Sequence, residues 1–554
     1  MLLSNLDLLA TAPGGVARLR ELILTLAVQG KLVPQDPADE PAGELLKKIR
    51  AEKDRLIAEG KIKRDKPLAE IAEEEKPFGL PQGWEWVRLG TVATISTGKL
   101  DANAAVTDGQ FPFFTCSQTP LKIDKYSFDC PAVLLAGNGD FNLKHYTGKF
   151  DAYQRTYVIE PVLLDLRFLY FTMSKYIGEL TKNQRGSAIP YLKLGDITDP
   201  LIPLPPLPEQ SRIVTRVEEL MRLCDALEVK GQLQAAQHAQ LVSTLLGTLT
   251  ASTTPEELAD HWQRVAQHFD LLLDRPAAID ALEQTLLQLA VRGLLVPQDP
   301  TDEPASALLQ RIRAEKDRLI ATGQIKRDKP LPPITDEEKP FELPVGWEWV
   351  RFGEYFFELC TGPFGSVIHK EDYVEDGIPL INPSHMIGGR ISHDPSVSVS
   401  QEMSKQLGAY RLTVGDVVLA RRGEVGRYAL VTEAEDGWLC GTGSFFVKLQ
   451  ESCNREFFGL VLEDPDLRRH LQGESVGSTM VNLNQRILLE TPMALPPLAE
   501  QSCIVTRVAA LRRLCADLRQ RLAERQSVQA RLAEALVANN AQTSTQQEDE
   551  CHAA

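Results

Sequence analysis

Amide, basic and aromatic side chains alternate along residues 137–157, GNGDFNLKHYTGKFDAYQRTY. In contacts with DNA, Asn and Gln form paired hydrogen bonds with adenine, Arg and Lys do so with guanine, and aromatic rings pack on methyl groups. The segment therefore predicts base contacts, and the alternative is a solvated β-hairpin with a few core aromatics. Its candidate contact residues are Asn138, Asn142, Lys144, Tyr146, Tyr153, Gln154 and Arg155.

Other loops with the same kinds of side chain occur in both halves of the chain. The first half has FTCSQT (114–119) and GSAIPYL (186–192), and the second has TGPFGS (361–366), INPSHM (381–386), RRGEVGR (421–427) and GSTMVNLNQR (477–486). Glu424 lies among the arginines of RRGEVGR and is a candidate to neutralise them. The candidate contacts in these loops are Thr115, Ser117, Gln118, Ser187, Ser366, Asn382, Ser384, Arg421, Arg422, Arg427, Ser478, Asn482 and Asn484.

Sequence motifs for catalysis are missing. The chain has no GxxxxGK[ST] loop for nucleotide phosphates, and AGNGD (136–140) lacks the GxGxxG pattern of a dinucleotide site. INPSH (381–385) lacks the second proline and the aromatic residue of the loop with which N6-adenine methyltransferases hold a flipped base. His145, His369, His385 and His393 do not have the spacing of metal ligands. We therefore expect a binding protein that is not an enzyme and has no cofactor or metal of its own.

The elements that position these loops are duplicated. LAVQGKLVPQDPADEPA begins at Leu26 and returns as LAVRGLLVPQDPTDEPA at Leu289, an offset of 263 residues that also relates the two copies of IRAEKDRLIA and of GWEWVR. LPPLPEQSRIVTRV at Leu204 returns as LPPLAEQSCIVTRV at Leu495, an offset of 291 residues. Two unlike inserts in a repeated frame predict a pseudo-symmetric scaffold that presents two different binding domains.

The repeats divide the chain into constant and variable parts. The expected fold class is α+β, with two mixed domains separated and joined by long antiparallel helices. The inserts share faint similarities, such as VLLAGNGD with VVLARRGE, so they are expected to be one fold with diverged loops. The expected boundaries are a helical region at 1–83, a recognition domain at 84–203, a central helical region at 204–346, a second recognition domain at 347–494, and a C-terminal helix and tail at 495–554.

Apolar spacing predicts long helices after each LPPL(P/A)EQ motif. Ile213, Val217, Leu220, Cys224 and Leu227 form a heptad seam, which the second copy repeats from Ile504 to Leu522. A helix of roughly 40 residues would be about 60 Å long, and the repeated seam favours packing of the two helices on each other. Further helices are predicted near 42–59 and 305–322. The Trp-Glu-Trp sequences at 84–86 and 347–349 predict a half-buried strand, with packing favoured over base stacking.

Charge and cysteine content limit the classes of protein to which the chain could belong. The net charge of the 554 residues is −16, so the chain alone is poorly suited to bind DNA phosphates. Residues 88–199 have 12 Lys and Arg against 11 Asp and Glu, whereas residues 351–490 have 13 against 20. Either the protein does not touch nucleic acid, or a basic partner supplies much of the phosphate contact. The nine cysteines lack a CxxC pair, so disulfides are not expected and a reducing cytoplasm fits. The sequence has no long apolar run, so no membrane span is expected.

Taken together, these features resemble the specificity (S) subunits of type I restriction-modification systems. The resemblance is carried by the two LPPL(P/A)EQ helices, by GWEWVRLG and GWEWVRFG, and by FPFFTCSQT, AGNGDF and AYQRTYVI, which occur in the family's order across nearly the whole chain. About 80 residues precede the first GWEWV, so the two ends of the chain resemble a split version of its central region.

The resemblance implies a division of labour. Each insert would recognise one half of a split, asymmetric double-stranded DNA site, and the constant helices would set the spacing between the halves. The helices would also dock two adenine-N6 methyltransferase (M) subunits, and motor–nuclease (R) subunits would join that core. S-adenosylmethionine, ATP and Mg would be bound by those partners.

Two alternatives remain at the level of sequence. The first is the recognition subunit of a related system whose partner is a fused methyltransferase–nuclease, which the neighbouring genes would distinguish. The second is a coiled-coil scaffold that does not bind DNA, which would be favoured by equal binding to random and specific duplexes. The sequence does not reveal the target bases or the spacer length.

Overall fold

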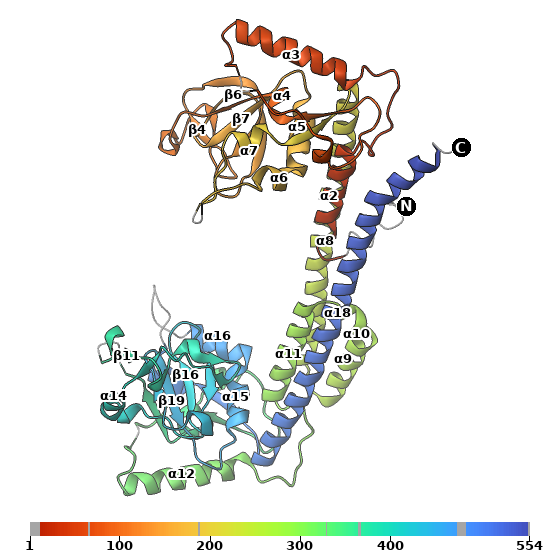
Figure 1. Ribbon diagram of the computed structural model, residues 1–554. Helices are drawn as coiled ribbons and strands as arrows, with labels where there is room; N and C mark the ends of the chain where they lie inside the picture. The colour runs from red at the N-terminus through yellow and green to blue at the C-terminus, as the bar shows by residue number, and fades with distance from the viewer. Residues whose placement is uncertain are drawn as a thin grey trace. The chain divides into compact units, whose positions relative to one another are not determined.

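The computed structural model describes residues 12–64, 67–186, 189–327, 329–363, 367–473 and 483–551 (Figure 1). The chain forms two compact units, one of residues 1–235 and 525–554 and the other of residues 236–524. Each unit contains one insert with constant helices beside it. Two long helices, α8 (Leu207–Thr250) and α18 (Leu498–Cys551), contribute residues to both units, and they have 44 and 54 residues.

The insert of the first unit is built around one mixed sheet. Its strand order is β2-β7-β5-β6-β3-β4, and all neighbours are antiparallel except the parallel pair β3 and β6. Alternate residues of β5 enter opposite cores, with Val133 facing helix α5 and Leu134 in a second cluster. The elements are β2 (Ala93–Thr97), β3 (Phe111–Phe114), β4 (Leu121–Ile123), β5 (Phe128–Ala136), β6 (Leu143–Ala152), β7 (Thr156–Pro161), α5 (Leu166–Lys175) and α6 (Ile177–Thr181).

The insert of the second unit repeats the central strands of the first. The order β10-β19-β16-β17 matches β2-β7-β5-β6, and a further sheet, β11-β15-β12-β18, lies in the region that is longer in this copy. The elements are β10 (Glu358–Thr361), β11 (Tyr373–Val374), β12 (Ile378–Ile381), β13 (Met386–Ile387), β14 (Arg390–Ile391), β15 (Ser398–Val399), α14 (Gln401–Gln406), β16 (Val417–Ala420), β17 (Tyr428–Leu430), β18 (Leu439–Cys440), β19 (Ser444–Lys448), α15 (Arg455–Glu463), α16 (Pro465–Gly473) and α17 (Gln485–Glu490).

A short ribbon closes each insert by pairing its first and last strands. β1 (Glu85–Arg88) pairs with β8 (Leu201–Leu204), and β9 (Glu348–Arg351) pairs with β20 (Pro492–Leu495). Beside each ribbon, a buried tryptophan donates a hydrogen bond to the glutamate of the LPPL(P/A)EQ motif. The Nε1–Oε2 distances are 2.9 Å for Trp84 and Glu209 and 2.8 Å for Trp347 and Glu500. These tryptophans therefore tie insert to helix, and the packing interpretation is confirmed.

The constant regions form the predicted helices and others that the sequence analysis did not identify. The predicted ones are α3 (Ala42–Ala58) and α12 (Ala305–Ala321). The mixed fold class, with two related domains and long helices, is confirmed. The additional helices of the constant regions are α2 (Gly15–Val28), α9 (Pro255–Gln267), α10 (Phe269–Leu272) and α11 (Pro276–Val291). The short helices α4 (Leu89–Val92), α7 (Gly195–Thr198) and α13 (Phe352–Tyr355) lie within the inserts.

The heptad seam of α8 has further partners besides the one expected. In the first unit, Ile213 and Val217 lie in one apolar cluster with Leu19 and Ile23 of α2 and with Phe168 of α5. The expectation overlooked α2, whose apolar face is available to the seam within the same constant region. The same cluster includes Ala533 of α18, so the expected packing between the long helices is present here together with α2 and α5.

The long helices do share a core in the second unit. Cys515 and Leu522 of α18 lie in one cluster with Val242 and Leu246 of α8 and with Leu282 of α11. This part of the seam meets the expectation, because residues of α8 and α18 are buried together. Helix α11 is equivalent to α2 by the 263-residue offset, so equivalent helices pack against a long helix in the two units.

A repeated glycine allows the chain to pass close to each tryptophan. Gly30 and Gly293 have φ angles of 69° and 74°, which favour glycine. A Cβ atom would lie 2.5 Å from Pro81 Cγ at Gly30 and 2.6 Å from Pro344 Cγ at Gly293. The identical glycine in LAVQG and LAVRG therefore has a steric cause.

Ion pairs beside the seams have opposite polarity in the two units. Arg20 of α2 lies 3.2 Å from Glu228 of α8, whereas Glu283 of α11 lies 2.6 Å from Arg519 of α18. Arg20 and Glu283 are equivalent by the 263-residue offset, and Glu228 and Arg519 by the 291-residue offset. The same contact is thus made twice with its charges reversed.

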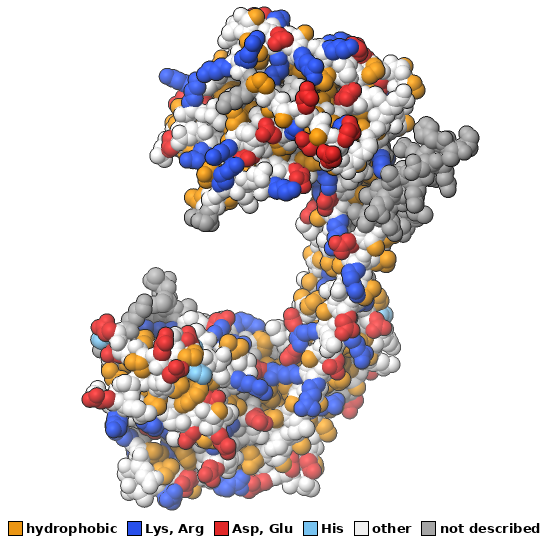
Figure 2. Space-filling model, viewed as in Figure 1, with side chains coloured by type: hydrophobic (Ala, Val, Ile, Leu, Met, Phe, Trp, Pro, Cys, Tyr) orange, Lys and Arg blue, Asp and Glu red, His pale blue; other side chains and the backbone are white. Residues whose placement is uncertain are grey.

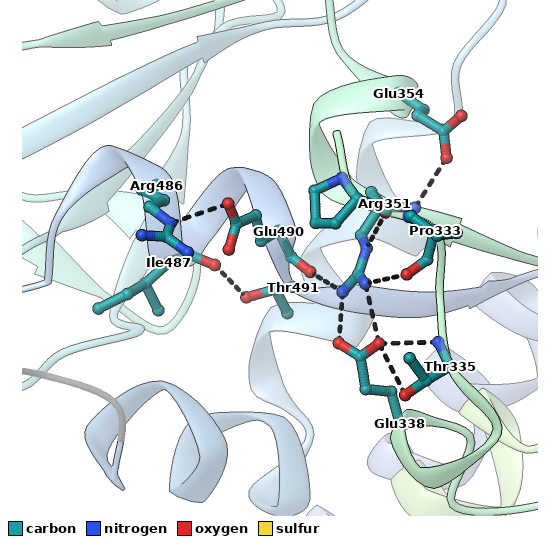
Figure 3. A network of polar contacts seen from close by, with 10 residues as sticks. Pro333, Thr335, Glu338, Arg351, Glu354, Arg486, Ile487, Glu490 and Thr491 are labelled. Carbon is teal, nitrogen blue, oxygen red and sulfur yellow. Dashed lines mark hydrogen bonds and ion pairs between the residues drawn. The ribbon is translucent and has the colours of Figure 1, made fainter. Parts of the chain in front are cut away.

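A buried arginine fixes the ribbon of the second unit (Figure 3). The Arg351 guanidinium is 2.7 and 2.9 Å from the two carboxylate oxygens of Glu338, and it also donates to the carbonyls of Pro332, Pro333 and Glu490. Mainly because of the bond from Arg351, the pKa of Glu338 falls to about 2. Arg88 and Glu75 make the equivalent pair in the first unit at 2.8 Å.

Candidate nucleic-acid interface

Backbone hydrogen bonds bring together the predicted loops of the first domain. Gly137 N donates to Arg155 O at 2.8 Å, Tyr153 N to Phe114 O at 2.9 Å, and Leu192 N to Gly137 O at 2.9 Å. These bonds join the residues after β3, the turn between β5 and β6, the turn between β6 and β7, and the segment before α7. Loops far apart in sequence therefore form one surface.

Asp140 lies at the centre of the polar side chains on this surface. Its carboxylate accepts hydrogen bonds from Gln118 Nε2 at 2.9 Å and from Asn142 Nδ2 at 2.6 Å. The bond from Asn142, followed by that from Gln118, lowers the pKa of Asp140. Asn142 Nδ2 also donates to Cys116 O at 2.7 Å, and Lys144 Nζ contacts Asn142 Oδ1. Asp140 was not among the predicted residues, although an acidic residue, Glu424, stands at the matching position of the second copy.

The remaining predicted residues of the first domain have varied surroundings. Gln154 is exposed, and its Nε2 lies 3.4 Å from an Asp101 oxygen. Arg155 is exposed with no ion-pair partner among the described residues. Tyr146 packs against Phe114 and Phe150, as the core alternative proposed. Asn138 and Tyr153 are half-buried and form backbone bridges. The buried Thr115 hydroxyl accepts a hydrogen bond from the backbone N of the exposed Ser117. Ser187 lies outside the described residues.

The loops of the second domain converge through similar bonds. Leu483 N donates to Arg421 O at 2.9 Å, which matches the bond between Leu192 and Gly137 at the equivalent position of the first copy. Arg421 N donates to Gly443 O, and Gln485 Nε2 donates to Thr361 Oγ1 at 2.8 Å. Gln485 was not predicted, although it lies in the chosen stretch GSTMVNLNQR.

Several predicted side chains of the second domain already have partners. Glu424 pairs with Arg427, which confirms the expected neutralisation for that arginine. Asn484 Oδ1 accepts from Ile487 N at 2.9 Å and caps α17. The Arg421 guanidinium lies 5.3 Å from the centre of the Phe445 ring. Asn382 is half-buried, and Ser384 and Arg422 are exposed. The remaining predicted residues, Ser366, Ser478 and Asn482, lie outside the described residues.

The surface charge is mixed rather than strongly basic. Figure 2 shows Lys and Arg interspersed with Asp and Glu over both units on the face in view, without a continuous basic area there. Within the described ranges, no group of three or more His, Cys, Asp or Glu side chains could hold a metal ion. No helix in those ranges is long and apolar enough to cross a membrane. The described cysteines are all free.

Two domains with one framework and unlike polar loops define a class of protein that presents two different binding surfaces. The family model for the type I restriction modification DNA specificity domain matches residues 81–237 and 344–525. The chain belongs to this family of type I restriction-modification specificity subunits. It is therefore a subunit for DNA sequence recognition, and the expectation that it is not an enzyme is confirmed, because these subunits are non-catalytic.

Individual relatives are similar over almost their full lengths. The type I restriction enzyme EcoEI specificity subunit of Escherichia coli is 36% identical over 560 residues, which cover 94% of this chain and 93% of that protein. The EcoAI specificity subunit of Escherichia coli is 37% identical over 558 residues, with the same coverage of 94% and 93%. A chain from a solved structure of the type I R-M system has 21% identity and a TM-score of 0.45, covering 84% of this chain and 99% of that chain.

Proposed function

We propose that the domains at 84–203 and 347–494 each recognise one half of a split, asymmetric site in double-stranded DNA. The observation that carries this proposal is a shared backbone framework with different side chains. The same hydrogen bond holds the loop at Gly137 and the loop at Arg421, yet the next residues are Asn138 and Arg422. Similar frameworks favour similar docking, whereas different side chains favour different bases.

The long helices would set the spacer and dock two adenine-N6 methyltransferase subunits, through which motor–nuclease subunits join. Exposed large apolar side chains on the helices support a docking role, because a partner that covered them would remove apolar surface from water. The exposed fractions are 60% for Leu223, 64% for Val229 and 57% for Leu233 on α8, and 58% for Leu514 on α18. S-adenosylmethionine, ATP and Mg would be bound by those partners, and a DNA ligand makes the cytoplasm the expected compartment.

Exchange of one domain tests the proposal. Residues from about Trp84 to Pro203 would be replaced by the corresponding domain of another specificity subunit, since β1 and β8 pair and mark the two ends of the insert. The methylated motif of a host that expresses the complete system would then be sequenced. We expect one half of the motif to change while the other half stays the same.

The control is the reciprocal exchange of residues from about Trp347 to Leu495, which should change the opposite half. Native mass spectrometry of both hybrids would establish that the complexes assemble. A hybrid in which both halves changed, or in which an assembled complex kept the original motif, would contradict the assignment of one half-site to each domain.

A further inference from the structure

Asp140 determines how two neighbouring amide groups are oriented. An ionised carboxylate can only accept hydrogen bonds, so the NH2 groups of Gln118 and Asn142 must face it. An aspartate is ionised at neutral pH, and the hydrogen bonds that lower the pKa of Asp140 favour the same charged form. The two carboxamides therefore differ in what they can offer to a base, according to their other bonds.

Asn142 has no donor left for a base. One N–H bond of its Nδ2 is directed to Asp140 at 2.6 Å and the other to Cys116 O at 2.7 Å. Its Oδ1 is in contact with Lys144 Nζ, and Lys144 is half-buried. A residue that recognises adenine must donate one hydrogen bond and accept another. Asn142 thus supports the loop, even though its residue type alone suggests a base contact.

Gln118 keeps both a donor and an acceptor. Its Nε2 gives one hydrogen bond to Asp140 at 2.9 Å, which leaves the second N–H, and Oε1 has no hydrogen-bond partner among the described residues. The side chain is exposed on the surface where the loops converge. Because Asp140 already restrains it, less rotamer entropy is lost when it binds.

We infer that Gln118, positioned by Asp140, recognises one adenine in the half-site of the first domain. This inference rests on the proposed function and adds a base and a residue to it. The free N–H of Gln118 would donate to adenine N7 and Oε1 would accept from the N6 amino group. The sequences DGQFP at the start of β3 and DGIP at the start of β12 match, so the residue of the second domain that corresponds to Gln118 is His385. His385 is 7% exposed, so the contact belongs to the first domain.

Asp140 itself is the competing reader, since a carboxylate can accept from the amino group of cytosine. Each of its oxygens already accepts a bond from a side chain, Oδ2 from Gln118 and Oδ1 from Asn142. A contact with cytosine would have to use a second lone pair on an oxygen that is already hydrogen-bonded, and the Asp140→Ala variant distinguishes this possibility from a contact made by Gln118.

The experiment is methylome sequencing of a host with the complete system and either Gln118→Ala or Asp140→Ala. For Gln118→Ala we expect one adenine in one half of the motif to become degenerate, with roughly a tenfold to hundredfold loss of preference. Asp140→Ala should relax the same position by a smaller factor, because Gln118 keeps its functional group. The matched control is Gln110→Ala, an exposed glutamine before β3, which should leave the motif unchanged.

The inference is overturned if Gln118→Ala leaves the motif intact, or relaxes a base other than adenine. Loss of a cytosine in Asp140→Ala would instead assign the contact to Asp140. If Gln118→Ala abolishes methylation, Gln118→Arg is decisive in a complex that native mass spectrometry shows to be assembled. A shift from adenine to guanine at one position supports the inference, and any other result rejects it. A wild-type motif that is not split would reject the proposed function, whatever the variants do.

Discussion

Two carboxylates, Asp140 and Glu338, orient neighbouring side chains in different settings. Asp140 is in the candidate interface and holds two amide groups. Glu338 holds Arg351 and also accepts from Thr335 N at 2.8 Å, which fixes the ribbon of the second insert. Neither role follows from residue type, because both depend on partners that the fold brings close.

The pair formed by Arg351 and Glu338 should make local stability depend on pH. The pKa of Glu338 is about 2 in the fold against its usual 4.5, so the pair stabilises the fold fully above about pH 4.5. This contribution should decline as the pH falls towards 2. Hydrogen exchange of peptides from β9 would measure it, and Glu338→Gln should remove this part of the pH dependence.

Substitution of the arginine has a larger expected effect. Arg351→Met removes a buried guanidinium that donates to Glu338 and to the carbonyls of Pro332, Pro333 and Glu490, and it should lower the local free energy of unfolding by about 1–2 kcal/mol. The control is Arg313→Met, because its ion pair with Glu354 is largely exposed and should contribute less than about 1 kcal/mol. Equal protection of β9 in the two variants would mean that Arg351 does not anchor the ribbon.

The sequence predicted which loops form the interface better than what each side chain does there. Residue type suggested Asn142, but its hydrogen-bond capacity is spent on Asp140 and Cys116, a contact between residues 26 positions apart. Tyr146 has the right chemistry to pack on a base methyl group and instead packs on Phe114. Such outcomes depend on which loops meet, and a single sequence does not report it.

Among the elements, local repeats were the most informative signal. The bounds of α3, Ala42–Ala58, follow from a pattern present in both copies. The packing of α2 on the α8 seam did not follow, because α2 precedes α8 by almost 200 residues in the chain and any apolar face would satisfy the heptad. The bond from Trp84 to Glu209 spans 125 residues and is likewise a product of the tertiary fold.

If the long helices set the spacer, lengthening them should lengthen it. Both α8 and α18 contribute residues to both units, so one heptad would be inserted in each, after Leu227 and after Glu524. Seven residues add about 10 Å of helix, or about three base pairs. We expect a methylated motif with the same two halves and a spacer longer by about that amount.

Insertion into α8 alone is the control, since the two helices would then differ in length and assembly should suffer. A doubly extended and active complex whose spacer is unchanged would show that the helices do not determine the distance between half-sites.

For the whole molecule, the net charge of −16 predicts weak DNA binding by the isolated subunit. Added methyltransferase subunits should raise the affinity for the specific duplex by orders of magnitude. They should also steepen its dependence on salt, because additional phosphate contacts release more counterions. A salt titration of binding by the lone subunit and by the ternary complex would test this. Equal affinity and equal slope would indicate that the partners do not supply phosphate contacts.

The reversed ion pairs favour the native pairing of helices in each half of the chain over an exchange of equivalent helices. A duplicated protein can exchange equivalent helices, and α2 could in principle take the place of α11 against α18. That exchange would set Arg20 opposite Arg519 and Glu283 opposite Glu228, and like charges at such positions are destabilising. The native pairing joins opposite charges in both units. The two halves thus carry opposite charges at equivalent positions, which disfavours the swapped arrangement that two identical repeats would permit.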